Sequence, residues 1–166
     1  HEMRDVFSRV GFGEYLGSGF PGESMGMLPS YRDWHPVTQA TFAFGYGLSA
    51  SPLQLARAYG VLANNGLKKD IKLLLDEGET NVSRVFSSDL SKTVNNMLES
   101  VVSESGTGKN AMIPHYRVAG KTATLHKVKA GGGYDENKYV SAFAGFSPAS
   151  NPRVVTVVII CLLYTS

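Results

Sequence analysis

The sequence predicts an α/β domain in which an antiparallel sheet packs against helices. Three segments of the 166-residue chain place apolar residues at helical spacing, and the last third contains three extended runs. The apolar runs 139–146 and 153–160 follow the extended segment 117–124, so the three are expected to form a meander. With 43% hydrophobic and 18% charged residues, the composition is that of a folded chain.

The N-terminal part of the chain predicts one helix followed by irregular structure. Residues 2–10 are expected to form the end of a helix, because apolar residues recur there at helical spacing. Residues 11–47 are rich in glycine and proline, so we expect irregular structure held by Trp34 and several tyrosines.

The next predicted helix has clear start and stop signals. Ser51 is a candidate N-cap, Pro52 occupies the first helical position, and Gly66 ends the pattern. Its apolar face is expected to contain Leu55, Ala56, Tyr59, Leu62 and Ala63. Residues 71–75 form a candidate short strand.

A further helix is predicted to begin near Ser88 and to run to about Ser103. Asp89 is favourable at its N-terminus, where the helix dipole attracts negative charge. The predicted apolar face consists of Leu90, Val94, Met97, Leu98 and Val101.

Composition and charge exclude several classes of function. The net charge of +2 is too small to indicate binding to nucleic acid or to an anionic membrane surface. The single cysteine, Cys161, excludes an internal disulfide and a cysteine-cluster metal site. The most apolar run, 154–164, is about half of the ~20 residues that a transmembrane helix needs. We expect neither a metal nor a cofactor.

Two phosphate-binding patterns fail on inspection. Gly108-Lys109 is followed by Asn110, where a phosphate-binding loop needs serine or threonine. The run 45–50 matches a dinucleotide fingerprint, but the helix begins after the motif, at Pro52, and not within it.

The triplet Lys121-Thr122-Ala123 lies on the first strand of the predicted meander. A Lys-Thr-Gly triplet on such a strand is a signature of penicillin-binding proteins and class A β-lactamases. The neighbouring sequence adds to this similarity, in the runs 40–47, 51–59, 63–66, 106–111 and 143–149. Together these residues resemble the transpeptidase domain of class B penicillin-binding proteins. The greatest similarity is to the division-specific septal peptidoglycan D,D-transpeptidases, which have a serine transpeptidase/β-lactamase-like fold.

This resemblance implies roles for three residues of the strand. Lys121 would supply positive charge beside a nucleophilic serine and a relay serine. Thr122 would offer its hydroxyl to the carboxylate of a stem peptide or a β-lactam. The backbone N–H of Thr124 would be an oxyanion-hole donor. The alternative is that Lys121 is an ordinary lysine on an edge strand and that the threonines only favour β-structure.

Strand geometry also predicts which way these side chains point. Lys121 and Ala123 should share one face, and Thr122 and Thr124 should share the other. Ala123 departs from the glycine of the family. Its methyl group would project into the cleft on the Lys121 face, which puts activity in question.

Four aromatic residues resemble those that form the walls of the substrate cleft in the family: Phe44, Tyr46, Tyr134 and Tyr139. Phe44 and Tyr46 flank Gly45 and are expected on a loop. For Phe44, packing in the core is an equally good interpretation. His115 and His126 are expected to be surface or strand residues, not catalytic bases.

The chain contains neither Ser-x-x-Lys nor Ser-x-Asn, the two motifs that carry the family's serines. It also begins at His1. Residues 1–160 are therefore expected to be the C-terminal portion of a transpeptidase domain, inactive on its own, and residues 161–166 an atypical tail. The resemblance places the parent protein at the periplasmic face of the inner membrane, anchored through a missing N-terminal helix.

The resemblance implies a peptidoglycan stem peptide and β-lactams as ligands, and division proteins as partners of the parent. Two alternatives remain. One is a serine β-lactamase, which the Phe44-Gly45-Tyr46-Gly47 segment disfavours. The other is a non-catalytic chain that only binds partners, which Ala123 suggests.

Overall fold

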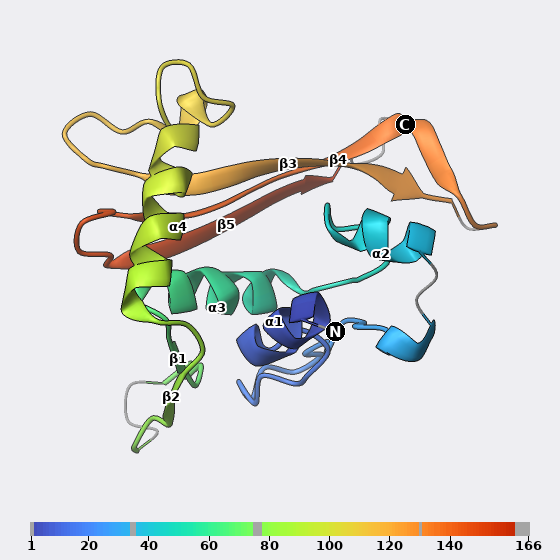
Figure 1. The fold of residues 1–166 in the computed structure, drawn as a ribbon, viewed down its shortest axis with the longest axis horizontal. Helices are drawn as coiled ribbons and strands as arrows, with labels where there is room; N and C mark the ends of the chain where they lie inside the picture. Colours follow the sequence, from blue (N-terminus) through green and yellow to red (C-terminus); the bar gives the residue numbers. More distant parts are fainter. Residues whose placement is uncertain (1, 34–35, 75–77, 130, 162–166) are drawn as a thin grey trace.

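The structure, a computed structural model, is described over residues 2–33, 36–74, 78–129 and 131–161. Within these ranges, helices pack against an antiparallel sheet. In Figure 1, most of the helices lie below the strands, and the helix labelled α4 crosses in front of them. The predicted class, an antiparallel sheet packed against helices, is therefore confirmed. None of the described helices is long and apolar enough to cross a bilayer.

The main sheet is the predicted meander. Its strands are β3 (Ala119–Val128), β4 (Tyr134–Ser147) and β5 (Val154–Cys161), and all pairs are antiparallel in the order β3-β4-β5. The β3–β4 register shifts between His126 and Lys127. Among the described strands, β3 and β5 are therefore the two edges of this sheet.

One face of the sheet packs against helices α3 and α4. Ala119 and Phe146 form a register pair on this face, and both are buried. The side chains that pack against this pair come from both helices and from β5: Tyr59, Leu62, Ala63, Leu98 and Val155. Because side chains alternate along a strand, positions 121 and 123 of β3 share this face.

Helix α3 (Pro52–Ala63) forms as predicted, with Ser51 as its N-cap. The Ser51 hydroxyl accepts a hydrogen bond from the Gln54 N–H at 3.2 Å, and the Gln54 side chain accepts one from the Ser51 N–H at 2.9 Å. This reciprocal pair is a capping box. Gly66 follows the helix with a φ of 84°, and a Cβ there would lie 2.2 Å from the carbonyl oxygen of Phe86. The exit of α3 therefore requires glycine.

The N-terminal part is more helical than predicted. Helix α1 (Glu2–Val10) confirms the first prediction. The prediction of irregular structure for 11–47 is wrong at its end, where α2 (Pro36–Phe42) follows a 3₁₀ turn. Phe42 is fully buried, and its ring centroid lies 5.9 Å from that of Phe7 on α1, so a tertiary contact stabilises this short helix. Trp34 lies outside the described residues.

Gln54 holds the irregular segment that precedes α2. Its side chain is fully buried, and its Nε2 donates to the carbonyl oxygens of Glu14 and Met25, both at 2.9 Å. A longer contact of 3.3 Å joins the same Nε2 to the carbonyl oxygen of Gly11. The two N–H groups of one helical side chain thus satisfy the carbonyls of Glu14 and Met25, and Arg57 Nη2 donates to the carbonyl oxygen of Gly11 at 2.9 Å.

The predicted strand over residues 71–75 is wrong. Residues 71–74 form no strand, and Leu75 lies outside the described residues. The strands lie on either side instead, as an antiparallel pair of β1 (Leu67–Lys69) and β2 (Val82–Arg84). These residues form strands because they pair with each other, and not because they are apolar. The pairing continues at Gly66, whose carbonyl oxygen accepts a hydrogen bond from the Val85 N–H at 2.8 Å.

Helix α4 (Ser88–Val101) confirms the third predicted helix, although the predicted apolar face is partly wrong. Leu90 and Met97 are exposed, Met97 to 61%, whereas Ser91 and Asn95 are buried. The buried stripe packs near the end of α3, where Asn95 Nδ2 donates to the carbonyl oxygen of Leu62 at 3.2 Å. Carbonyls in the last turn of a helix have no intrahelical partner, which favours a polar side chain at Asn95. The buried Ser91 hydroxyl has no hydrogen-bond partner among the described residues.

The sheet face opposite α3 is apolar and open. Val154, Val158 and Ile160 project from this face of β5 and are exposed, Ile160 to 65%. Val154 also borders a hollow of about 730 Å³ that Met112 and Tyr116 line. Exposed apolar faces and unpaired strand edges promote association between chains.

We therefore expect the 166-residue chain, expressed on its own, to self-associate. Each aliphatic side chain that contact removes from water contributes about 1.5–3 kcal/mol. Size-exclusion chromatography over a range of concentrations measures this. The triple variant Val154→Thr, Val158→Thr, Ile160→Thr keeps β-branched residues on the strand and should elute nearer the monomer volume. A monodisperse wild-type monomer at every concentration would contradict the expectation.

Candidate active site on strand β3

Residues 121–124 lie near the start and middle of β3, along the edge of the described sheet. Lys121 pairs with Ala144, which is buried on the face covered by helices. Thr122 pairs with Phe143 on the opposite face, where the Phe143 ring lies 2.4 Å from the position of a Cβ built on Gly120. This register agrees with the prediction that Lys121 and Ala123 share one face of the strand and that Thr122 and Thr124 share the other.

The polar groups of Lys121 and Thr122 are brought together. Lys121 Nζ donates to the carbonyl oxygen of Thr122 at 2.9 Å and lies 3.5 Å from the Thr122 hydroxyl. The Lys121 side chain is exposed, and Thr122 is half-buried. An ammonium and a hydroxyl therefore lie side by side at the strand edge, where an anionic ligand could reach both.

Ala123 and Thr124 continue this open edge. Both are exposed, and they pair in register with Ala142 and Ser141 of β4. The Ala123 methyl group is on the face of the strand that position 121 shares, and it projects into accessible space. A glycine would leave that space empty.

The candidate aromatic residues of β4 lie further along the sheet. Tyr139 pairs in register with His126, and their ring centroids are 4.7 Å apart. His126 is a strand residue, and its Nδ1 lies 3.2 Å from the carbonyl oxygen of Asp135. Tyr134 is the first residue of β4 and pairs in register with Val128.

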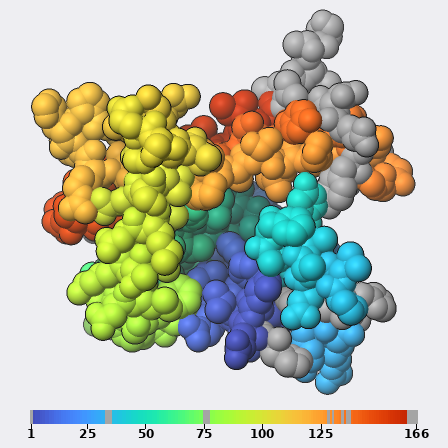
Figure 2. Space-filling view, turned by 45° about the horizontal axis from the view of Figure 1, so that its top comes forward, coloured from blue at the N-terminus to red at the C-terminus, as the bar shows by residue number. Residues whose placement is uncertain are grey.

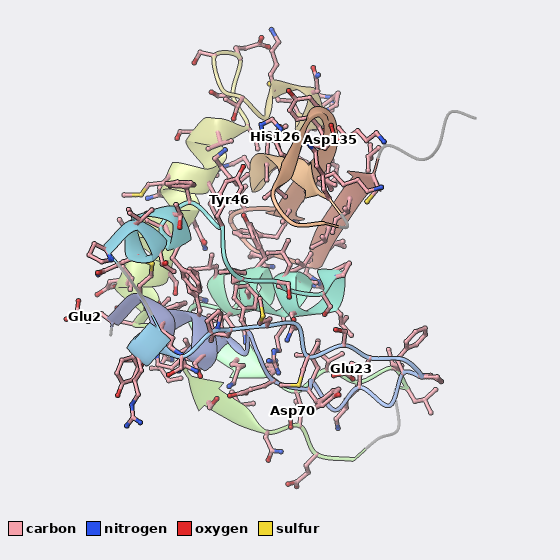
Figure 3. The ribbon with its side chains drawn as sticks, turned by 90° about the vertical axis from the view of Figure 1, so that its right-hand side faces the viewer. Glu2, Glu23, Tyr46, Asp70, His126 and Asp135 are labelled. Atoms are coloured by element: carbon pink, nitrogen blue, oxygen red, sulfur yellow. The ribbon has the colours of Figure 1, made fainter. Side chains whose placement is uncertain are left out.

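Phe44 and Tyr46 lie on the turn after α2, as predicted. Phe44 is 65% exposed, so it is not part of the core, and its ring packs edge-on against Tyr46 with centroids 5.5 Å apart. In Figure 3, Tyr46 lies below His126 and Asp135, and in Figure 1 the turn is on the α3 side of the sheet. The structure therefore pairs these two aromatic residues with each other.

One residue at the strand edge was missed from the sequence. The Thr122 hydroxyl donates to the hydroxyl of Thr107 at 3.1 Å, and Thr107 lies in the loop after α4. In the sequence, the run 106–111 contributes only to the family resemblance. The available signal was the pair of glycines on either side of Thr107, which is typical of a loop that approaches another backbone closely.

The described residues offer no group of three His, Cys, Asp or Glu side chains that could hold a metal ion. The groups that the structure brings together at this edge are the Lys121 ammonium group and the hydroxyls of Thr122 and Thr107.

Comparison with known families interprets this arrangement. Residues 1–161 match the family described as the penicillin binding protein transpeptidase domain. The chain belongs to this family. Two transpeptidase relatives are the probable peptidoglycan D,D-transpeptidase PenA of Neisseria gonorrhoeae and the peptidoglycan D,D-transpeptidase FtsI of Escherichia coli. Each is 40% identical to this chain.

The matches cover nearly all of this chain but only part of each relative. They include 96% of the chain and 27% of PenA, and 94% of the chain and 26% of FtsI. The chain thus spans about a quarter of the length of these relatives.

Solved transpeptidase structures share the fold. The transpeptidase domain of Burkholderia pseudomallei penicillin-binding protein 3 has a TM-score of 0.88 at 41% identity, over 96% of this chain and 49% of that one. Penicillin-binding protein 3 of Mycobacterium tuberculosis in complex with aztreonam has a TM-score of 0.88 at 33% identity, over 95% of this chain and 39% of that one. The same protein has also been solved with ampicillin.

Proposed function

We propose that this chain is the C-terminal portion, over residues 1–160, of the transpeptidase domain of a division-specific septal D,D-transpeptidase. In the proposed reaction, a serine of the complete protein is acylated by a D-Ala-D-Ala stem peptide, and the acyl group then passes to the amine of a neighbouring stem. β-Lactams would acylate the same serine. The single observation that carries the proposal is the Lys121–Thr122 pair at the open edge of β3 in a chain of this family.

The edge of β3 supports a division of roles. Lys121 would provide positive charge beside the serine, and the Thr122 hydroxyl would bind the ligand carboxylate through a charge-assisted hydrogen bond. The Thr124 N–H would donate to the oxyanion. Ala123, Phe44, Tyr46, Tyr134 and Tyr139 would line the substrate cleft.

The setting of the complete protein is part of the same proposal. A cross-linking enzyme of this type would act at the septum, on the periplasmic side of the inner membrane, together with division proteins. Residues 161–166 are proposed to be an atypical tail. Cys161 is the last residue of β5, exposed and paired with Val140, and residues 162–166 lie outside the described ranges.

A fluorescent penicillin tests the proposed function. The complete protein should form a covalent band that survives denaturation, whereas the 166-residue chain should form none, because it lacks the family's Ser-x-x-Lys and Ser-x-Asn motifs. A stoichiometric band on the 166-residue chain would reveal another nucleophile in it.

The lifetime of the band on the complete protein separates the alternatives. A persistent acyl-enzyme supports the transpeptidase. Rapid loss of the label with continued hydrolysis of penicillin would indicate a serine β-lactamase. No label at all on a folded complete protein would indicate a chain that only binds partners.

We predict that removing the Ala123 methyl group increases the rate of acylation. If it crowds the acylation site, Ala123→Gly in the complete protein should speed acylation by up to about 10²-fold, the effect typical of a ~1 Å misplacement of a reacting group. The matched control is Ala142→Gly, which removes the register partner's methyl from the neighbouring strand. Equal acylation rates for Ala123→Gly and wild type would mean that the methyl group is harmless.

A further inference from the structure

A polar hollow lies where the end of α3, helix α4 and the turn between β4 and β5 meet, and its volume is about 310 Å³. Figure 2 shows the yellow-green helix α4 beside the orange and red strands, at the left of the molecule. Residues 121–124 are not among the residues that line the polar hollow. Asparagine is prominent in its lining, which contains Asn64, Asn65, Asn95, Asn96 and Asn151.

Asn95 contributes an unpaired acceptor to this lining. Its side chain is only 9% exposed, and its Nδ2 donates to the carbonyl oxygen of Leu62 at 3.2 Å. Its Oδ1 accepts no hydrogen bond from any described residue. Buried polar atoms in folded proteins are almost always paired, either within the protein or with ordered water or a ligand. A donor group that enters the polar hollow could therefore pair with Asn95.

The charged residues of the lining leave one positive charge uncompensated. They are Lys92, Glu99 and Arg117. Both oxygens of Glu99 are already bound, because Arg117 Nε donates to Oε2 and Arg117 Nη2 donates to Oε1, each at 2.8 Å. Lys92 is exposed and has no ion-pair partner among the described residues. Its ammonium group therefore favours a ligand that carries a carboxylate.

The remaining amide side chains suit a peptide. Those of Asn65, Asn96 and Asn151 form no hydrogen bond with another described residue. Each amide offers a carbonyl acceptor and N–H donors, which are the groups that a peptide bond also presents. The described lining contains no aromatic residue, so it provides no ring on which a nucleic-acid base could stack.

We infer that the polar hollow binds an acidic peptide segment of a partner protein, with a carboxylate at Lys92 and peptide groups at the asparagines. A peptide N–H would donate to Asn95 Oδ1, and peptide carbonyls would accept from the exposed amides. The volume of the polar hollow is near the lower limit of the ~300–1,000 Å³ typical of ligand pockets, so it suits a short segment. The inference goes beyond the proposed function, in which neither Lys92 nor the asparagines take part.

NMR titration of the complete protein, prepared with isotope-labelled asparagine, tests this inference. The probe is the peptide acetyl-Gly-Asp-Gly-Asp-Gly-amide, and the control peptide has Asn in place of both Asp residues. The acidic peptide should shift the side-chain amide resonances of Asn95, Asn96 and Asn151 in a saturable way. The control peptide should bind about 3- to 10-fold more weakly, as expected for the loss of one charge-assisted hydrogen bond at an accessible site.

Substitutions in the lining separate the charge from the amide contacts. Lys92→Ala should weaken binding of the acidic peptide by the same factor of about 3 to 10 and leave binding of the control peptide unchanged. Asn151→Ala should weaken binding of both peptides equally, because a neutral amide contact does not depend on the carboxylate. Lys69→Ala is the matched control: Lys69 is exposed on β1 and does not line the polar hollow, so the effect should stay below about twofold.

Three results would overturn the inference. The first is the absence of a saturable shift with the acidic peptide, and the second is an equal loss from Lys92→Ala and Lys69→Ala. The third is tighter binding of a peptidoglycan stem peptide at the same asparagines, which would assign the polar hollow to the cell-wall substrate. Labelling with fluorescent penicillin is a separate readout, and the Lys92→Ala variant should label like wild type. If the wild-type protein is not labelled, the proposed function fails, whereas the peptide titration still decides the inference.

Discussion

Replacing Lys121 by alanine should slow acylation of the complete protein by benzylpenicillin by about 10²–10³-fold, the typical cost of losing one preorganised group from an acyl-transfer site. Lys121 Nζ lies at the open edge of β3, in contact with Thr122. In the proposed reaction it would supply positive charge beside the serine of the complete protein. The substitution removes this charge without removing a buried side chain, because Lys121 is exposed.

Lys127→Ala is the matched control. Lys127 lies six residues further along β3, beyond the register shift, and is also exposed. The Lys127→Ala variant removes the same formal charge from the same strand. It should change the acylation rate by less than about twofold, since exposed charges interact weakly over the separation between positions 127 and 121. Similar losses for the two variants would show that the effect of Lys121 is general electrostatics and not a local role.

Lys121→Arg adds a second comparison. It keeps the positive charge but replaces a compact ammonium with a planar guanidinium, which cannot make the same contacts. We expect a partial loss. Full activity of Lys121→Arg would mean that charge alone matters at this position.

Replacing Gln54 by leucine should destabilise the complete domain by about 3–5 kcal/mol, since each buried polar group left unpaired costs about 1–3 kcal/mol. Leucine has a similar volume but no polar atoms. The carbonyls of Glu14 and Met25 and the N–H of Ser51 would lose their partner. A loss of this size is a large fraction of the ~5–15 kcal/mol net stability of a domain.

Gln39→Leu is the matched control, because Gln39 lies exposed on α2 and should change stability by less than about 0.5 kcal/mol. Denaturant unfolding measures both variants. Hydrogen exchange should locate the effect of Gln54→Leu in residues 11–27, which contain the freed carbonyls. Unchanged exchange in this segment would show that Gln54 does not hold it.

The elements that were predicted correctly depend on signals close together in the chain. Ser51 and Pro52 mark the start of α3 within two residues, and Gly66 marks its exit. The strands of the meander follow one another directly, so consecutive extended runs were enough to predict them. The Lys121-Thr122 pair is equally local, since adjacent residues on one strand carry it.

The errors have a common physical cause, which is dependence on a distant partner. Helix α2 has only seven residues, too few to be stable alone, and its Phe42 packs on Phe7 of α1. Helix α4 buries Ser91 and Asn95 in place of Leu90 and Met97, where it packs near the end of α3 and Asn95 donates to the carbonyl oxygen of Leu62.

The same distinction applies to the candidate site and to what holds the fold around it. Composition, helix caps and the strand motif established the class of domain, the family resemblance and the role expected of Lys121, because each depends on neighbouring residues. The contact between Thr107 and Thr122 and the contacts of Gln54 with residues 11–25 depend on the folded chain. Hydrogen bonds need donor and acceptor within about 3 Å, and only tertiary packing brings groups that lie 15 to 43 residues apart in sequence to that distance.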